Sequence, residues 1–466
     1  MRGRFLGDGM LNRRGLAVLA GLAATALLLA ACRGESEPRL PDLTPFDPET
    51  ADQIHEIRSS MVEVRELSTA KIEEGTLDRG ALIQYYQEWN TWTREHEGAE
   101  FEAWNAAWRL LHMIGPEDDL LDLFTAQGGE DTMGLYSSSD NELALVIEEA
   151  GNISMGDRLV LAHEYVHSLQ DARFDLVKLH ELEDKDGANT NYGTTVECLM
   201  EGDATFSMVR YAVEKLDDEE QEALLDEWDK EDGTDSEARE YPPALERYID
   251  FPYDQCADFV QYLFDEGGWS AVNRAYENVP VSTEQILHPE KYLAGEKPSA
   301  LELPDLSDSL GAGWKQLDDS MFDEFDVYNY VLTSLEGQEK HAERVADHAA
   351  DGWGGGRIAL YKGDDPSRVL IHLRLDWDTE SDTSAFVDAF LYVAGLTAGR
   401  WWEPDADPET VRWDAANEYG YATWEGATFT AVIATNEEDL RKATGALSFD
   451  LDEALAPTRE DRPPPE

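Results

Sequence analysis

Positively charged side chains are scarce in this sequence: 37 Lys and Arg stand against 99 Asp and Glu, which gives a formal net charge of −62. A surface of that sign repels nucleic acid and anionic lipid headgroups, so both are disfavoured as partners. The acidic residues occur in every segment rather than in one tail. Such a distribution fits a protein kept soluble where concentrated salt screens the repulsion between carboxylates. We therefore expect a halophilic protein; the alternative is an acidic secreted protein from an ordinary environment.

Cysteine is almost absent, with three residues in a chain of 466. Cys32 closes an apolar run near the N-terminus, so only Cys198 and Cys256 remain for the rest of the chain. They could pair as a disulfide in an oxidising exterior, and two buried free thiols are an equal alternative.

Long apolar runs are missing except for one, Leu16–Ala31, which follows Arg13 and Arg14. A basic start, about 15 apolar residues and small residues before a cysteine are typical of a cleavable export signal. The sequence Leu-Ala-Ala-Cys at its end resembles a lipoprotein lipobox, which predicts residues 1–32 as signal peptide and Cys32 as the lipidated first residue. The two arginines also resemble a twin-arginine signal. The alternative is a retained membrane span, for which the run is short.

Everything after Cys32 should then lie at the cell surface, attached to the membrane only through the lipid. Apolar residues make up 42% of the chain, with 13 Trp, 18 Tyr and 15 Phe, so a large core is possible and two or three domains fit the length. We expect five segments: the signal peptide; a flexible tether at 33–50, rich in Pro and acidic residues; a helical domain at 51–345; a small α+β domain at 352–450; and a disordered tail at 451–466.

Helical periodicity dominates the first large domain. Apolar residues recur at three- and four-residue spacing between 51 and 123, which predicts helices throughout that stretch. Two short apolar stretches between Gly134 and Ile147, separated by polar turn residues, predict a β-hairpin. Ser154 and Asp157 form the pattern of a capping box that opens the next helix. A further helix is expected at 194–216.

The last 115 residues have a different sequence pattern. Alternating strands are expected at 357–361 and 369–375, a helix at 379–398, two strands within 420–435 and a helix at 437–447. This ββαββα order indicates a small α+β domain.

Five residues in the expected helix after the hairpin carry the clearest chemistry: His163-Glu164-Tyr165-Val166-His167. Histidines four apart share a helix face and can bind one Zn²⁺, with Glu164 beside them as a base for an activated water. A third ligand could come from Asp171 or Glu201. Three ligands along one straight helix cannot easily surround a metal, so Glu201, from a separate helix, is favoured.

With Glu201-Gly-Asp-Ala downstream, these residues resemble the gluzincin clan of zinc metallopeptidases. The resemblance is closest to a largely uncharacterised group of bacterial and haloarchaeal surface lipoproteins, and it covers residues 130 to 435. It also includes the stretches Ser282–Lys291 and Gly352–Arg357, which identify the group without indicating a chemistry. It implies an α+β protein whose mostly helical domain is zincin-like, with a short sheet whose edge strand holds extended peptides by main-chain hydrogen bonds.

The resemblance also implies peptide-bond hydrolysis, with His163, His167 and Glu201 as zinc ligands and Glu164 as general base. A separate His or Tyr commonly stabilises the oxyanion in this clan, and here His288 and Tyr253 are the candidates. Members like thermolysin carry Asp four residues after the ligand Glu, where this chain has Thr205. The partner that orients a ligand histidine therefore stays open between Asp171, Glu197 and Asp203.

Three functions are compatible with these features. The first is a lipid-anchored, extracytoplasmic zinc peptidase that acts on peptides or unfolded protein. The second is a surface binding protein that keeps the fold without turnover, although its four site residues are intact. The third is a zinc hydrolase with a non-peptide substrate, and another divalent metal could use the same atoms.

Overall fold

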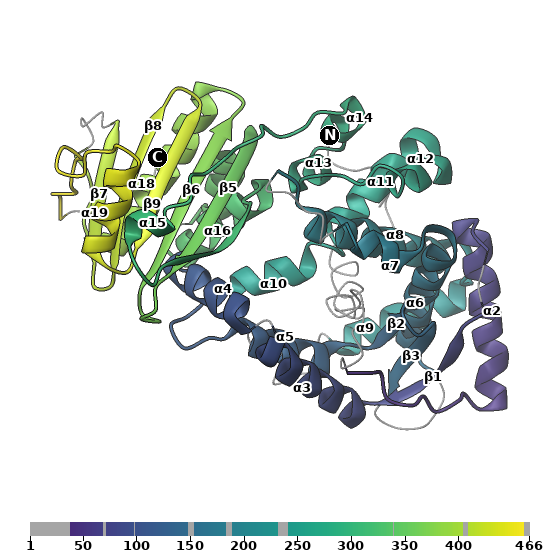
Figure 1. Ribbon diagram of the computed structural model, residues 1–466. Coiled ribbons are helices and arrows are strands. Elements are labelled where there is room, and N and C mark those ends of the chain that lie inside the picture. The colour runs from purple at the N-terminus through teal and green to yellow at the C-terminus, as the bar shows by residue number, and fades with distance from the viewer. Residues whose placement is uncertain are drawn as a thin grey trace.

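A computed structural model describes residues 38–68, 71–96, 98–147, 153–182, 189–231, 241–338, 340–403 and 409–460. The expected signal peptide, Cys32 and the end of the C-terminal tail lie outside these ranges. Helices predominate over strands, and a separate sheet-rich part follows the helical part, so the protein is α+β (Figure 1). Within the described ranges, no helix combines the length and apolar character that crossing a membrane requires.

The helical part runs from α2 to α15 and includes a small sheet. Its elements are α2 (Pro48–Arg65), β1 (Glu73–Asp78), α3 (Arg79–His96), α4 (Gly98–Leu110), α5 (Leu120–Asp131), β2 (Gly134–Ser137), β3 (Glu142–Ile147), α6 (Met155–Phe174), α7 (Leu176–His180), α8 (Tyr192–Glu214), α9 (Asp218–Glu231), α10 (Pro243–Asp250), α11 (Gln255–Gly267), α12 (Trp269–Ala275), α13 (Thr283–Leu287), α14 (Pro289–Ala294) and α15 (Ser307–Leu310).

The expected hairpin is confirmed, since β2 and β3 pair antiparallel with Gly134 opposite Leu145. The prediction of continuous helix between 51 and 123 is wrong at β1, which pairs parallel with β3 and gives the sheet order β1-β3-β2. The β1 sequence, Glu-Glu-Gly-Thr-Leu-Asp, has one large apolar side chain, so its strand character depends on the partner strand rather than on its own pattern.

The expected flexible tether at 33–50 is corrected in its described portion. Backbone groups of Thr44 exchange two hydrogen bonds with Thr76 of β1, at 2.8 and 2.9 Å. Leu40 is buried in the core beneath α3, and α2 already begins at Pro48. The chain from 38 onward therefore belongs to the fold, because it covers the outer edge of β1.

The sheet part contains six antiparallel strands in the order β4-β5-β6-β9-β8-β7. Helices α16, α17 and α18 pack on one face together with α4, while α15 and α19 cover the other face (Figure 1). Its elements are β4 (Lys315–Met321), α16 (Glu324–Leu335), α17 (Ala342–Ala350), β5 (Trp353–Lys362), β6 (Val369–Trp377), α18 (Glu380–Ala398), β7 (Thr410–Ala415), β8 (Glu418–Glu425), β9 (Thr428–Ala434) and α19 (Glu437–Ala446).

Two differences from the expected ββαββα order concern strands. Three strands rather than two follow α18, because β7 pairs with β8 along the edge of the sheet. The sheet also begins before the expected boundary at 352, since β4 pairs with β5. Strand β4 has the sequence Lys-Gln-Leu-Asp-Asp-Ser-Met, in which polar and apolar residues do not alternate. Such a polar sequence is common for an edge strand.

The C-terminal tail is ordered as far as residue 460, so the predicted disorder at 451–466 is wrong for its described portion. Leu455 pairs with both Thr410 and Arg412 of β7 through its backbone. Leu451 and Ala454 are buried beside α19. The tail thereby satisfies backbone groups at the edge of β7 that would otherwise face water.

The stretches 282–291 and 352–357 meet where the helical part joins the sheet part. Asp323, at the start of α16, accepts a hydrogen bond from the backbone N–H of Thr283 at 3.1 Å. A Cβ atom at Gly356 would lie 1.9 Å from a backbone oxygen in the turn before α16, so only glycine fits there. These contacts explain both stretches as the joint between the two parts.

Candidate metal centre

Helix α6 contains the two histidines and lies in the core of the helical part. Every residue from Leu159 to Gln170 is buried, so this stretch of the helix has no solvent face and its polar side chains must find partners inside. The expected capping box is confirmed, with Ser154 and Asp157 exchanging side-chain to backbone hydrogen bonds. Glu227 of α9 accepts hydrogen bonds from the next two backbone N–H groups. These contacts hold the position of α6 beneath the hairpin.

Helix α8 crosses beside α6 and supplies Glu201. Its neighbour Gly202 is a packing requirement, because a Cβ atom there would lie 2.4 Å from the backbone oxygen of Cys256. Cys198 and Cys256 form a disulfide with their Cα atoms 5.2 Å apart, which decides between the two alternatives for these cysteines. The glycine and the disulfide together hold the start of α11 against α8, next to Glu201.

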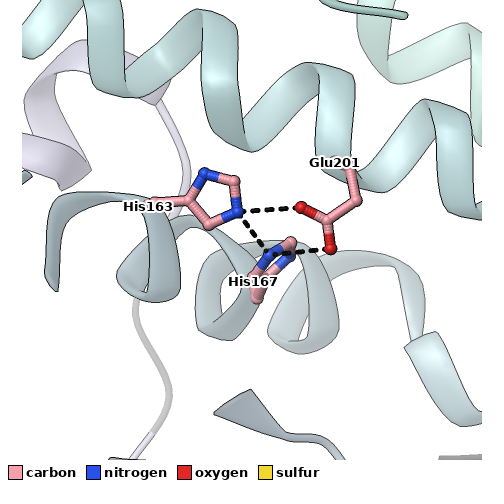
Figure 2. Close-up of side chains that lie close together, drawn as sticks. All are labelled: His163, His167 and Glu201. Atoms are coloured by element: carbon pink, nitrogen blue, oxygen red, sulfur yellow. Dashed lines mark hydrogen bonds and ion pairs between the residues drawn. The ribbon is translucent and has the colours of Figure 1, made fainter. Parts of the chain in front are cut away.

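The side chains of His163, His167 and Glu201 converge on one point (Figure 2). The two Nε2 atoms of the histidines lie 3.1 Å apart, and the Glu201 oxygens lie 2.8 Å from His163 and 3.5 Å from His167. All three residues are buried. Two imidazoles and one carboxylate, offering atoms within 4.8 Å of one another, form a donor set that catalytic zinc uses in peptidases. The three residues therefore fit a metal ion.

Electrostatics within this cluster couple the three side chains. Burial opposes the charge on Glu201, yet the neighbouring histidines outweigh it and lower its pKa to about 2. Burial likewise opposes protonation of His167, but the Glu201 carboxylate raises its pKa to about 9. Burial lowers the pKa of His163. The carboxylate is thus a permanent anion that attracts one positive charge, which a proton or a metal ion can supply.

Glu164 lies next to this cluster and faces the hairpin. A Cβ atom at Gly134 of β2 would lie 3.0 Å from Cγ of Glu164 and 3.4 Å from its Oε1. Strand β2 is an edge strand of the small sheet. Burial raises the pKa of Glu164 to about 8. The carboxyl group therefore lies between the ligand cluster and an edge strand, with a proton affinity suited to proton transfer near neutral pH.

The two oxyanion candidates are differently placed. Tyr253 lies in the turn before α11, is buried, and its ring centroid is 6.0 Å from that of His163. His288 lies between α13 and α14, and its Nε2 pairs with the Glu324 carboxylate at 2.8 Å. That contact raises the pKa of His288, which ties this side chain to α16. The structure thus brings Tyr253 to the cluster and connects His288 to the joint instead.

The three candidates for orienting a ligand histidine also separate. Asp171 accepts hydrogen bonds from the Tyr136 hydroxyl at 2.8 Å and from the backbone N–H of Leu176 at 3.0 Å, so it links the end of α6 to β2 and does not contact a ligand. Glu197 lies half-buried on α8, one turn before Glu201. Asp203 is fully buried, and it is linked to His167 through the side chain of Gln170, which hydrogen-bonds to both.

The sequence patterns did not indicate Gln170 as a site residue. Its Oε1 lies 2.9 Å from Nδ1 of His167, on the side opposite the cluster, and it is fully buried. The available signal was its place three residues after His167, on the same helix face.

A second group of carboxylates could be mistaken for a metal site. Oxygens of Glu284, Glu296 and Asp378 also lie within 4.8 Å of one another. The ammonium of Lys291 sits among them, at 2.6, 3.1 and 3.0 Å. The cation among these carboxylates is therefore a side chain of the protein itself.

Residues 320–444 match a family described as "Domain of unknown function (DUF8575)". The match covers most of the sheet part and leaves α6 and α8 outside. No curated protein and no solved structure matches the chain.

Proposed function

We propose that this protein is a zinc metallopeptidase, with His163, His167 and Glu201 as ligands. The observation that carries the proposal is the convergence of three buried donor atoms from α6 and α8 beside a carboxyl group that faces an edge strand. Zinc held there would supply a Lewis acid that polarises a carbonyl group and lowers the pKa of water.

Glu164 is the general base in this proposal. Its carboxylate accepts a proton from the attacking water and returns that proton to the nitrogen of the leaving amine. Its pKa of about 8 is a consequence of burial, and a nearby cation would lower it toward the working pH. An extended substrate would pair its backbone with β2, which would direct the scissile bond toward Glu164.

Tyr253 is the oxyanion stabiliser that we infer, because it is the candidate that lies beside His163. Its hydroxyl would donate a hydrogen bond to the oxygen that becomes negative in the transition state. Tyr253→Phe should lower kcat by about 10²-fold with little change in KM, because that interaction forms only in the transition state. An equal rise in KM with kcat unchanged would assign Tyr253 to substrate binding instead.

The location is also a proposal. Lipidation of Cys32 after export, by the twin-arginine or the general route, would attach the protein to the outer face of the cell membrane. Mass spectrometry of the membrane-extracted protein should find a chain that begins at a diacylated Cys32. A soluble, unmodified chain would contradict the anchor without affecting the metal centre.

The test of function combines metal analysis with a digest. Protein purified in high salt should contain one zinc per chain and should cleave casein or members of a peptide library. A chelator should abolish cleavage, and added zinc should restore it. Stoichiometric zinc without any cleavage would favour the surface binding protein, and cleavage confined to a non-peptide ester or amide would favour a different hydrolase.

A further inference from the structure

The hydrogen bonds around His167 continue away from the cluster in one connected series. Gln170 donates from Nε2 to the backbone oxygen of Met200 at 2.9 Å and to Oδ2 of Asp203 at 3.3 Å. Asp203 in turn accepts from Nε of Arg65 at 2.7 Å. Gln170, Asp203 and Arg65 are each fully buried. The series therefore joins α6, α8 and the last residue of α2 without solvent between them.

The donors in this series fix the direction of every bond. A guanidinium has only donors and is always charged, so Asp203 must accept from Arg65. The Met200 carbonyl can also only accept, so the amide nitrogen of Gln170 must face both of them. Its oxygen is then turned toward His167, where it can only accept. Nδ1 of His167 must consequently carry a proton, so Nε2, on the Glu201 side, is the nitrogen that is left to bind a metal.

Other contacts keep Arg65 and Asp203 in place. The Arg65 guanidinium lies 4.2 Å above the ring of Trp269, and its Nη2 donates to Asn273 at 2.7 Å. The Tyr276 hydroxyl donates to Asp203 at 2.8 Å. Each of these partners belongs to α12 or the turn after it, so the far end of the series is held by a fourth helix.

We propose that Gln170 is a positioning residue for the metal centre: backed by Asp203 and Arg65, it holds His167 in the tautomer and orientation that bind the metal. This rests on the proposed zinc site and goes beyond it by assigning its support. His163 differs, because its Nδ1 has no hydrogen-bond partner in the described part of the chain. In the described part of the chain, the hydrogen bond between Gln170 and Nδ1 thus fixes the orientation of His167, whereas His163 has no such bond.

Gln170→Met tests this, because methionine is unbranched, similar in length and unable to accept strongly from Nδ1. The zinc dissociation constant should rise by 10- to 100-fold, about the loss seen when a partner of a metal-bound histidine is removed. Ser168→Ala is the matched control: Ser168 is equally buried on α6, but its hydroxyl bonds to the Tyr165 carbonyl, so its zinc affinity should stay unchanged.

A spectroscopic readout separates positioning from mere stability. In the zinc-loaded wild type, NMR should detect a slowly exchanging, hydrogen-bonded proton on Nδ1 of His167, and Gln170→Met should lose it. If that proton is absent from the wild type, the proposal is overturned even when no variant folds. Unchanged zinc affinity in a folded Gln170→Met also overturns it. A wild type that binds no zinc at all would instead contradict the proposed function.

Discussion

The described part of this protein holds two clusters of side chains of the kinds that bind metals, one buried and one largely exposed, and they balance their charge in different ways. Around His163, His167 and Glu201, the groups next to the carboxylate are imidazoles, which can exchange a proton for a metal. Around Glu284, the neighbouring cation is the Lys291 ammonium, which is covalently part of the chain. A cluster of ligand-type side chains therefore fits a metal when its own partners leave the positive charge to be supplied from outside.

The largest effect should come from Glu164, since it lies beside the three ligands of the first group without being one of them. Glu164→Gln should lower peptide cleavage by about 10³-fold and leave the zinc content unchanged, because the amide cannot accept the proton from water. Glu296→Gln, in the second group, is the control and should leave cleavage intact. Retained cleavage in Glu164→Gln would remove this residue from its role.

Zinc should stabilise the first group and be indifferent to the second. At a zinc concentration about a thousand times its dissociation constant, the free energy of unfolding should increase by about 4 kcal/mol. Thermal unfolding with and without zinc measures this. Glu201→Gln should lose most of the increase, whereas Asp378→Asn should keep it. Equal zinc stabilisation of wild type and Glu201→Gln would place the metal elsewhere.

Removing the internal cation should damage only the second group. Lys291→Met leaves the Glu284 carboxylate, whose side chain is 3% exposed, without its ammonium partner. The free energy of unfolding should fall by about 2 kcal/mol, less than for a fully buried pair because Lys291 is partly exposed. Adding Glu284→Gln should recover part of the loss in denaturant titrations. If the double variant loses as much free energy of unfolding as the two single variants together, the pair is not coupled.

A further effect concerns pH. Burial raises the pKa of Glu284 from 4.5 to about 7, despite Lys291. The folded state therefore binds this proton more tightly than the unfolded state, so the contribution of Glu284 to stability declines as pH rises from 4.5 to about 7. Glu284→Gln should flatten the pH dependence of unfolding in that window by up to about 3 kcal/mol. An unchanged slope would mean that the carboxylate stays ionised throughout.

The sequence predicted those features that rest on local rules. The capping box at Ser154, the hairpin and the helices α6 and α8 follow from short-range patterns. The preference for Glu201 over Asp171 followed from helix geometry alone, because side chains stacked along one axis cannot surround an ion. The structure brings Glu201 to the histidines and takes Asp171 to Tyr136.

Features that depend on distant partners were beyond such rules. Strand β1 has little apolar pattern and exists because β3 pairs with it. The roles of Gln170 and Arg65 require three helices to pack before either side chain has its partner. The order of residues 38–47 and 451–460 likewise comes from strand edges elsewhere in the chain that these segments cover.

The most direct test of the metal centre is X-ray absorption at the zinc edge of protein loaded with one equivalent of zinc. We predict a first shell of two imidazole nitrogens and carboxylate oxygen at about 2.0–2.2 Å, with the outer-shell scattering of two histidine rings. His163→Ala should remove one ring from that signal. A sulfur shell at about 2.3 Å, or a shell of oxygens without imidazole, would contradict the account.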